Sequence, residues 1–80
     1  MYNIEISPSA FKFLEKLQKG NRNIAQRIVN VIDELSTAPF MGKKLEGSLA
    51  SFRSLRVAEY RIIYLIIEKK ILIQIVKISH

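Results

Sequence analysis

The chain has 80 residues, the size of one small domain, so we expect a single domain over residues 1–80 and no cleft between two domains. Hydrophobic residues make up 49% and charged residues 25% of the chain, which is a globular and not a disordered composition. The absence of cysteine and the single histidine exclude a disulfide framework, a thiolate nucleophile and most metal sites, and we expect no cofactor.

Positive charge is concentrated in the second half of the chain. Residues 1–39 hold five basic and four acidic side chains, whereas residues 40–80 hold eight and three, which together give the formal net charge of +6. Such a field favours a polyanionic partner such as nucleic acid, although a merely solvated surface has the same composition. The longest apolar run, Ile62–Ile67, is far too short to cross a bilayer, so we expect a cytoplasmic protein without a membrane partner.

A short strand and two helices are predicted for the first half of the chain. Tyr2–Ile6 alternates apolar and polar residues, as a half-buried strand does. Ser7, followed by proline, predicts the N-cap of a helix that Gly20 ends, and a second helix begins at Asn21 or Asn23. The short link makes the helices an antiparallel hairpin. Their core-facing residues are expected to be Ala10, Phe13, Leu14, Leu17, Ile24, Ile28, Val31, Ile32 and Leu35.

The second half predicts a loop followed by strands. Residues 36–51 have no clear period and predict a connecting loop, held against the domain by Phe40, Met41 and Leu45. Three runs of β-forming residues come next, separated by the turns Ala58-Glu59 and Lys69-Lys70: Phe52–Val57, Tyr60–Glu68 and Ile71–Ile78. The order β-α-α-β-β-β predicts an α+β fold in which the helical hairpin packs on one face of a four-stranded, mainly antiparallel sheet.

A symmetric Ala58-Glu59 turn places Arg56 directly opposite Arg61. Like charges at directly opposed positions destabilise a sheet by about 0.2–1 kcal/mol, so this pair suggests that an anion binds between the two guanidinium groups. The alternative is that each arginine pairs with a nearby carboxylate, such as Glu59 or Glu46.

The same register sorts the strand residues into two faces. The bulkier face is expected to pack against the helices and carries Leu55, Val57, Tyr60, Ile62, Tyr64, Ile66, Ile73 and Ile75. The face of the arginines also carries Ser54, Ile63, Leu65, Gln74, Val76 and Ile78. Because no helix of this chain would cover those apolar side chains, we expect a segment of another protein, or self-association, to cover this face.

Several blocks of the sequence resemble the RelE/ParE superfamily of type II toxins. They are Leu45-Glu46-Gly47, the block from Phe52 to Tyr64, and a last strand ending Ile-Val-Lys-Ile-Ser-His80. The most specific part is Leu55-Arg56-Val57-x-x-Tyr60-Arg61, and the resemblance covers essentially the whole chain. It implies a RelE-like fold and a toxin that a cognate antitoxin holds inactive.

In the RelE branch, the resemblance implies a ribosome-dependent endoribonuclease that needs no metal. The 2′-hydroxyl of the mRNA attacks the adjacent phosphate, and basic side chains on the open sheet face stabilise the charge that develops. Carried over to this sequence, Arg61 of the Tyr-Arg motif stabilises the transition state and Arg56 is its cross-strand companion. The resemblance also assigns three lysines to contacts with the RNA backbone: Lys43, Lys44 and Lys77.

Two departures from the family pattern concern further catalytic candidates. Members active as ribonucleases usually carry basic residues on the strand before the motif, where this sequence has Phe52 and Ser54, and Arg53 reaches that face only if the register shifts by one residue. Members also commonly continue past the last strand with an Arg and a Tyr; His80 stands where that tail begins and is a candidate for proton transfer. The alternatives are a ParE-like inhibitor of DNA gyrase and an inactive paralogue that only binds an antitoxin.

Overall fold

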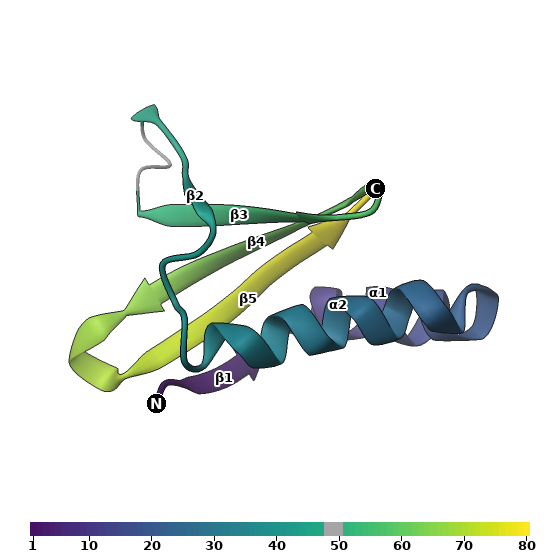
Figure 1. Cartoon of the computed structure of the whole chain (residues 1–80), viewed down its shortest axis with the longest axis horizontal. Helices are drawn as coiled ribbons and strands as arrows, with labels where there is room; N and C mark the ends of the chain where they lie inside the picture. The colour runs from purple at the N-terminus through teal and green to yellow at the C-terminus, as the bar shows by residue number, and fades with distance from the viewer. Residues whose placement is uncertain (48–50) are drawn as a thin grey trace.

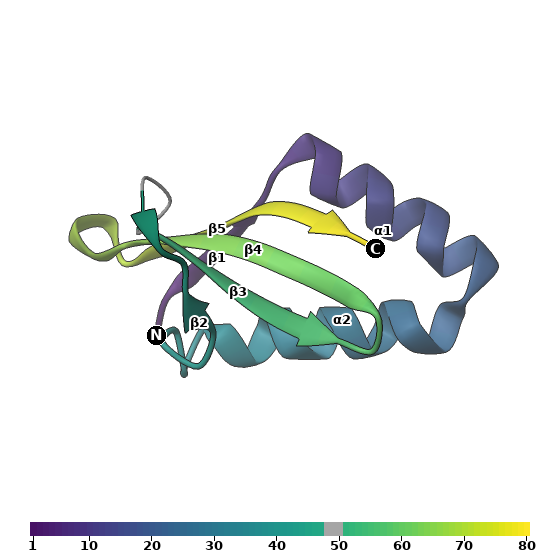
Figure 2. The ribbon, with the colours of Figure 1, turned by 90° about the horizontal axis from the view of Figure 1, so that it is seen from above.

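The computed structural model describes residues 1–47 and 51–80, which form two α-helices and one five-stranded sheet. Both helices lie on the same side of the sheet, which we call the covered face (Figure 1). Neither helix packs on the opposite side, which we call the open face (Figure 2). The elements in chain order are β1 (Asn3–Ile6), α1 (Pro8–Gly20), α2 (Arg22–Leu35), β2 (Lys43–Lys44), β3 (Phe52–Val57), β4 (Tyr60–Ile67), a 3₁₀ turn (Glu68–Lys70) and β5 (Leu72–Ser79).

The strands are arranged in the order β1-β5-β4-β3-β2. β1 pairs with β5 in parallel, and the other neighbouring strands are antiparallel. The prediction of a mainly antiparallel sheet with a helical hairpin on one face is confirmed. The prediction of four strands is wrong, because Lys43–Lys44 inside the expected loop forms a fifth strand on the edge beside β3. Two residues are too few to produce a strand period in the sequence.

The helix boundaries follow from side-chain caps. Ser7 Oγ accepts a hydrogen bond from the Ala10 amide at 3.2 Å, which confirms the predicted N-cap of α1. Asn21 then ends α1 and caps α2, since its Oδ1 accepts from the Ile24 amide at 3.3 Å. The two helices are therefore joined by a single residue, which requires the antiparallel hairpin that the sequence predicts.

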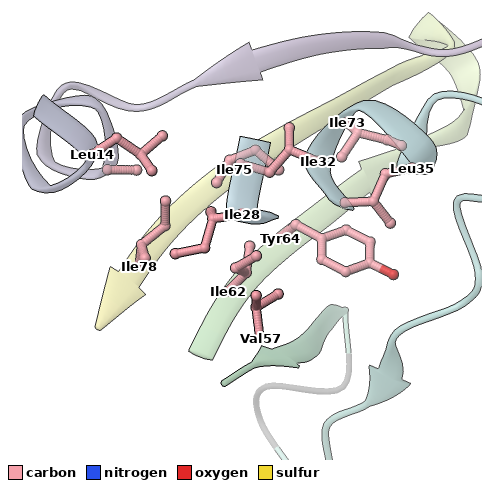
Figure 3. Close-up of a cluster of buried hydrophobic side chains, with 11 residues drawn as sticks. Leu14, Ile28, Ile32, Leu35, Val57, Ile62, Tyr64, Ile73, Ile75 and Ile78 are labelled. Carbon is pink, nitrogen blue, oxygen red and sulfur yellow. The ribbon is translucent and has the colours of Figure 1, made fainter. Parts of the chain in front are cut away.

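The core lies between the helix pair and the covered face of the sheet (Figure 3). Of the predicted helix residues, Ala10, Leu14, Ile28, Ile32 and Leu35 are buried, and the remaining four pack against the core partly buried. The sheet contributes Val57, Ile62, Tyr64, Ile73, Ile75 and Ile78. This burial of branched aliphatic side chains supplies most of the driving force for folding.

Tyr64 combines a fully buried ring with a hydroxyl that holds the loop before β2. The hydroxyl donates to the Pro39 carbonyl at 2.8 Å and accepts from the Gly42 amide at 2.9 Å. The expectation that Phe40 and Met41 hold this loop down by burial is wrong, because these residues are 54% and 39% exposed, whereas Leu45 is half-buried. Hydrogen bonds with the buried phenol of Tyr64 and with Arg53, and not burial of Phe40 or Met41, hold this segment in place.

Burial raises the pKa of the Tyr64 hydroxyl above its ordinary value of 10.0, although the Gly42 hydrogen bond and the charge of Arg53 oppose the shift. The folded state therefore keeps this proton at a pH where the unfolded chain has lost it, so its contribution to stability is complete below about pH 10 and falls as the pH rises through the folded pKa.

We expect Tyr64→Phe to lower the free energy of unfolding by about 1–3 kcal/mol at neutral pH, because the buried Gly42 amide loses its acceptor. We also expect the variant to lose less stability than the wild type between about pH 9 and about pH 11, measured by urea unfolding. Identical alkaline losses in the two proteins would contradict the assignment of this titration to Tyr64.

Candidate nucleic-acid interface

The predicted pairing of Arg56 with Arg61 is present in the structure. The two-residue turn between β3 and β4 closes because Ala58 adopts a left-handed conformation with φ of 54°, and Arg56 then lies opposite Arg61 on the open face. Both arginines are exposed. Among residues 1–47 and 51–80, the one contact between a basic and an acidic side chain within salt-bridge distance joins His80 Nε2 to Glu59 Oε2 at 3.0 Å, so neither guanidinium has a carboxylate partner there.

A β-bulge at Val76 determines which side chains of β5 join the arginines. Tyr64 pairs with Ile75, but the preceding residue, Ile63, pairs with Lys77, so Val76 is an extra residue in β5. The bulge turns Lys77 to the open face beside Arg61. The expectation that Ile78 lies on the arginine face is wrong, because the same shift buries its side chain in the core.

Ser7 stabilises this bulge. Its Oγ donates to the Val76 carbonyl at 2.8 Å, and its amide donates to the Ile75 carbonyl at 2.9 Å. The residue that caps α1 therefore also satisfies backbone groups where the regular ladder is interrupted. The sequence of β5 alone does not predict this contact, because Ser7 and Val76 are 69 residues apart in the chain.

Four cationic side chains from four strands share the open face. One cross-strand row contains Arg56, Arg61 and Ser79, and the next row runs from Lys43 through Ser54 and Ile63 to Lys77. We call Lys43, Arg56, Arg61 and Lys77 the basic cluster. All four are exposed, and neither row contains a carboxylate. Glu5 lies on the same face only in the following row, where Gln74 donates to its carboxylate, and cations gathered in neighbouring rows of a sheet form a surface for a phosphate backbone.

The other predicted site residues lie on the covered side of the sheet. Lys44 pairs with Arg53, and Arg53 pairs with the buried Tyr64, so the one-residue shift that would bring Arg53 to the open face does not occur. His80 follows Ser79 of the open face and packs edge-on against the Tyr60 ring at 5.3 Å between centroids. The structure therefore separates Arg53, Lys44 and His80 from the basic cluster.

The described residues contain no group of three His, Asp or Glu side chains that could hold a metal ion. Neither α1 nor α2 has the length and hydropathy that a membrane-crossing helix needs, and no other α-helix is formed by residues 1–47 and 51–80.

The model of a protein family described as the ParE toxin of the type II toxin-antitoxin system, parDE, matches residues 4–80. The chain belongs to this toxin family. It is thus a type II toxin of the RelE/ParE superfamily, as the resemblance in the sequence implies. No curated protein matches the chain significantly.

Solved structures support the fold of this toxin. A chain of the toxin-antitoxin complex RelBE2 from Mycobacterium tuberculosis is 28% identical with a TM-score of 0.86, and the match covers 99% of this chain and 96% of that chain. The YoeB/ParE toxin from Agrobacterium tumefaciens is 21% identical with a TM-score of 0.85, over 96% and 95% of the two chains. The intact E. coli RelBE toxin-antitoxin complex matches at 17% identity with a TM-score of 0.80, over 99% and 95%. The fold is RelE-like.

The register of β5 can be tested by cysteine cross-linking, because the chain has no cysteine of its own. We expect the pair Arg61→Cys/Ser79→Cys to form a disulfide under mild oxidation, since these positions face each other. The pair Arg61→Cys/Ile78→Cys serves as the control and should remain reduced, because the bulge turns position 78 to the other face. Preferential cross-linking of the control pair, measured by non-reducing electrophoresis, would mean that β5 is not bulged.

Proposed function

We propose that this toxin binds mRNA at the ribosome through the basic cluster and cleaves it without a metal ion. The observation that carries the proposal is the uncovered pair Arg56 and Arg61, flanked by Lys43 and Lys77, with no carboxylate in either cross-strand row. Opposed like charges destabilise a sheet, and a bound phosphodiester offsets this cost, because its single negative charge lies between the two guanidinium groups and accepts hydrogen bonds from both.

In the proposed reaction, the 2′-oxygen attacks phosphorus and the bond from phosphorus to the 5′-oxygen breaks, which leaves a 2′,3′-cyclic phosphate and a 5′-hydroxyl. Arg61 and Arg56 donate hydrogen bonds to the non-bridging oxygens, where negative charge develops. The ammonium group of Lys77 protonates the leaving 5′-oxygen, the proton of the 2′-hydroxyl passes to solvent, and solvent returns a proton to the Lys77 amine. Orienting the RNA for in-line attack is the main task of Lys43 and of the ribosome.

The same face is the proposed binding site of a cognate antitoxin. RelBE2 and E. coli RelBE, to which this chain is similar, are toxin-antitoxin complexes. Half-buried Ile63 and Leu65 lie beside the basic cluster, so an acidic segment with apolar side chains would match the face in charge and in hydrophobicity. An antitoxin bound there would exclude mRNA directly, and in its absence the same apolar side chains are available for self-association.

We expect Arg61→Ala to reduce mRNA cleavage on translating ribosomes by about 10²–10³-fold, as the loss of one donor to a developing oxyanion does. Primer extension on translated mRNA, with and without purified protein, measures the cleavage. Arg27→Ala is the matched control, because Arg27 is an exposed arginine of α2 on the other side of the sheet. Cleavage ends that persist unchanged in Arg61→Ala would contradict the proposal.

Inhibition of DNA gyrase is the second candidate function, and the match to the ParE family model favours it. In that case the basic cluster binds a protein or DNA surface and no bond is broken. A gyrase supercoiling assay separates the two functions: inhibition of supercoiling together with intact mRNA supports the gyrase target. Antitoxin binding without either activity and without growth arrest on expression identifies an inactive paralogue.

A further inference from the structure

Two side chains from the covered side of the sheet hold the loop that leads into β2. Tyr64 Oη bonds both the Pro39 carbonyl and the Gly42 amide, at 2.8 and 2.9 Å. Arg53 Nη1 donates to the Gly42 carbonyl at 2.8 Å and to the Phe40 carbonyl at 3.4 Å, and its guanidinium carbon lies 5.0 Å from the centre of the Phe40 ring. Gly42 is thus bonded at both its amide and its carbonyl.

The contact between Gly42 and Tyr64 leaves no room for a side chain. A Cβ atom at position 42 would lie 2.5 Å from Tyr64 Oη and 2.7 Å from its Cε1. Since the Tyr64 ring is fully buried and cannot move away, the backbone of the loop can approach this closely only because residue 42 is glycine. The phenol therefore determines where the loop backbone runs.

The residue after this fastened glycine is Lys43 of the basic cluster. β2 consists of Lys43–Lys44 alone, and its register places Lys43 opposite Ser54 on the open face. An edge strand of two residues has too few ladder hydrogen bonds and too little apolar contact to determine its own register. Both lysine side chains are exposed and contribute little packing of their own.

We propose that Tyr64 and Arg53 are positioning residues for RNA binding, which hold Lys43 on the open face by fixing the backbone of Gly42. The proposal rests on the function proposed above for the basic cluster. It gives Arg53 a part in the site although its side chain lies on the opposite side of the sheet from Arg56 and Arg61.

The salt dependence of binding to a single-stranded RNA oligonucleotide tests this proposal. Each phosphate contact contributes about 0.7 to the slope of log affinity against log salt concentration for a single strand. We expect Lys43→Ala and Tyr64→Phe each to reduce the slope by about 0.7, and the double variant to lose no more than either alone. Arg53→Met should reduce the slope by the same amount as Tyr64→Phe, and it changes a half-buried side chain and not a fully buried one. Tyr60→Phe, the same change at the first residue of β4, should retain the wild-type slope.

A second measurement does not depend on RNA. In nuclear magnetic resonance spectra, the contact between Lys43 and Ser54 across β2 and β3 should be lost in Tyr64→Phe and in Arg53→Met, and retained in Tyr60→Phe. If the wild type shows no salt-dependent RNA binding, the proposed function fails, and the positioning role is then judged by this contact alone. If the contact and the wild-type slope both persist in Tyr64→Phe and Arg53→Met, the positioning proposal is overturned.

Discussion

The alternation of side chains along β3, β4 and β5 determines both faces of the sheet at once. Residues that follow one another point to opposite sides, so the register that buries Val57, Ile62 and Tyr64 also brings Arg56 opposite Arg61. A shift by one residue would expose core side chains worth about 1.5–3 kcal/mol each. The repulsion between the arginines costs only about 0.2–1 kcal/mol. The hydrophobic core therefore holds the two guanidinium groups together against their own repulsion.

The N-terminal segment, β1 and Ser7, supports the strand that carries Lys77, although none of the proposed catalytic residues belongs to this segment. β1 pairs with the last strand, and the junction between β1 and α1 brings Ser7 to the bulge of β5. One serine thus begins a helix and supports the extra residue that turns Lys77 outward. Because this contact joins the start of the chain to its last strand, the basic cluster is complete only when the whole domain has folded.

The side chains of the open face determine what the chain can contribute to the proposed reaction. Arginine and lysine bind phosphate and stabilise developing charge, and these tasks need only position. Proton transfer near neutral pH is best served by an imidazole, but the one histidine of the chain packs against Tyr60 on the covered side, so the proposed reaction uses the ammonium group of Lys77 as its acid. The RelE-like fold is shared by relatives at 17–28% identity, and a shared fold does not by itself assign an activity.

The sequence by itself determined what depends on neighbouring residues: the helix caps, the periods of both helices and of the long strands, and the symmetric turn that opposes Arg56 and Arg61. Only the tertiary structure decided features whose partners lie far apart in the chain. The bulge at Val76 depends on Ser7, 69 residues away, and the course of the loop into β2 depends on Tyr64, 22 residues beyond Gly42. A periodic pattern indicates which face of a sheet a residue prefers. It does not indicate a hydrogen bond from a distant element, such as the one that stabilises the bulge in β5 or those that fix the loop before the two-residue strand β2.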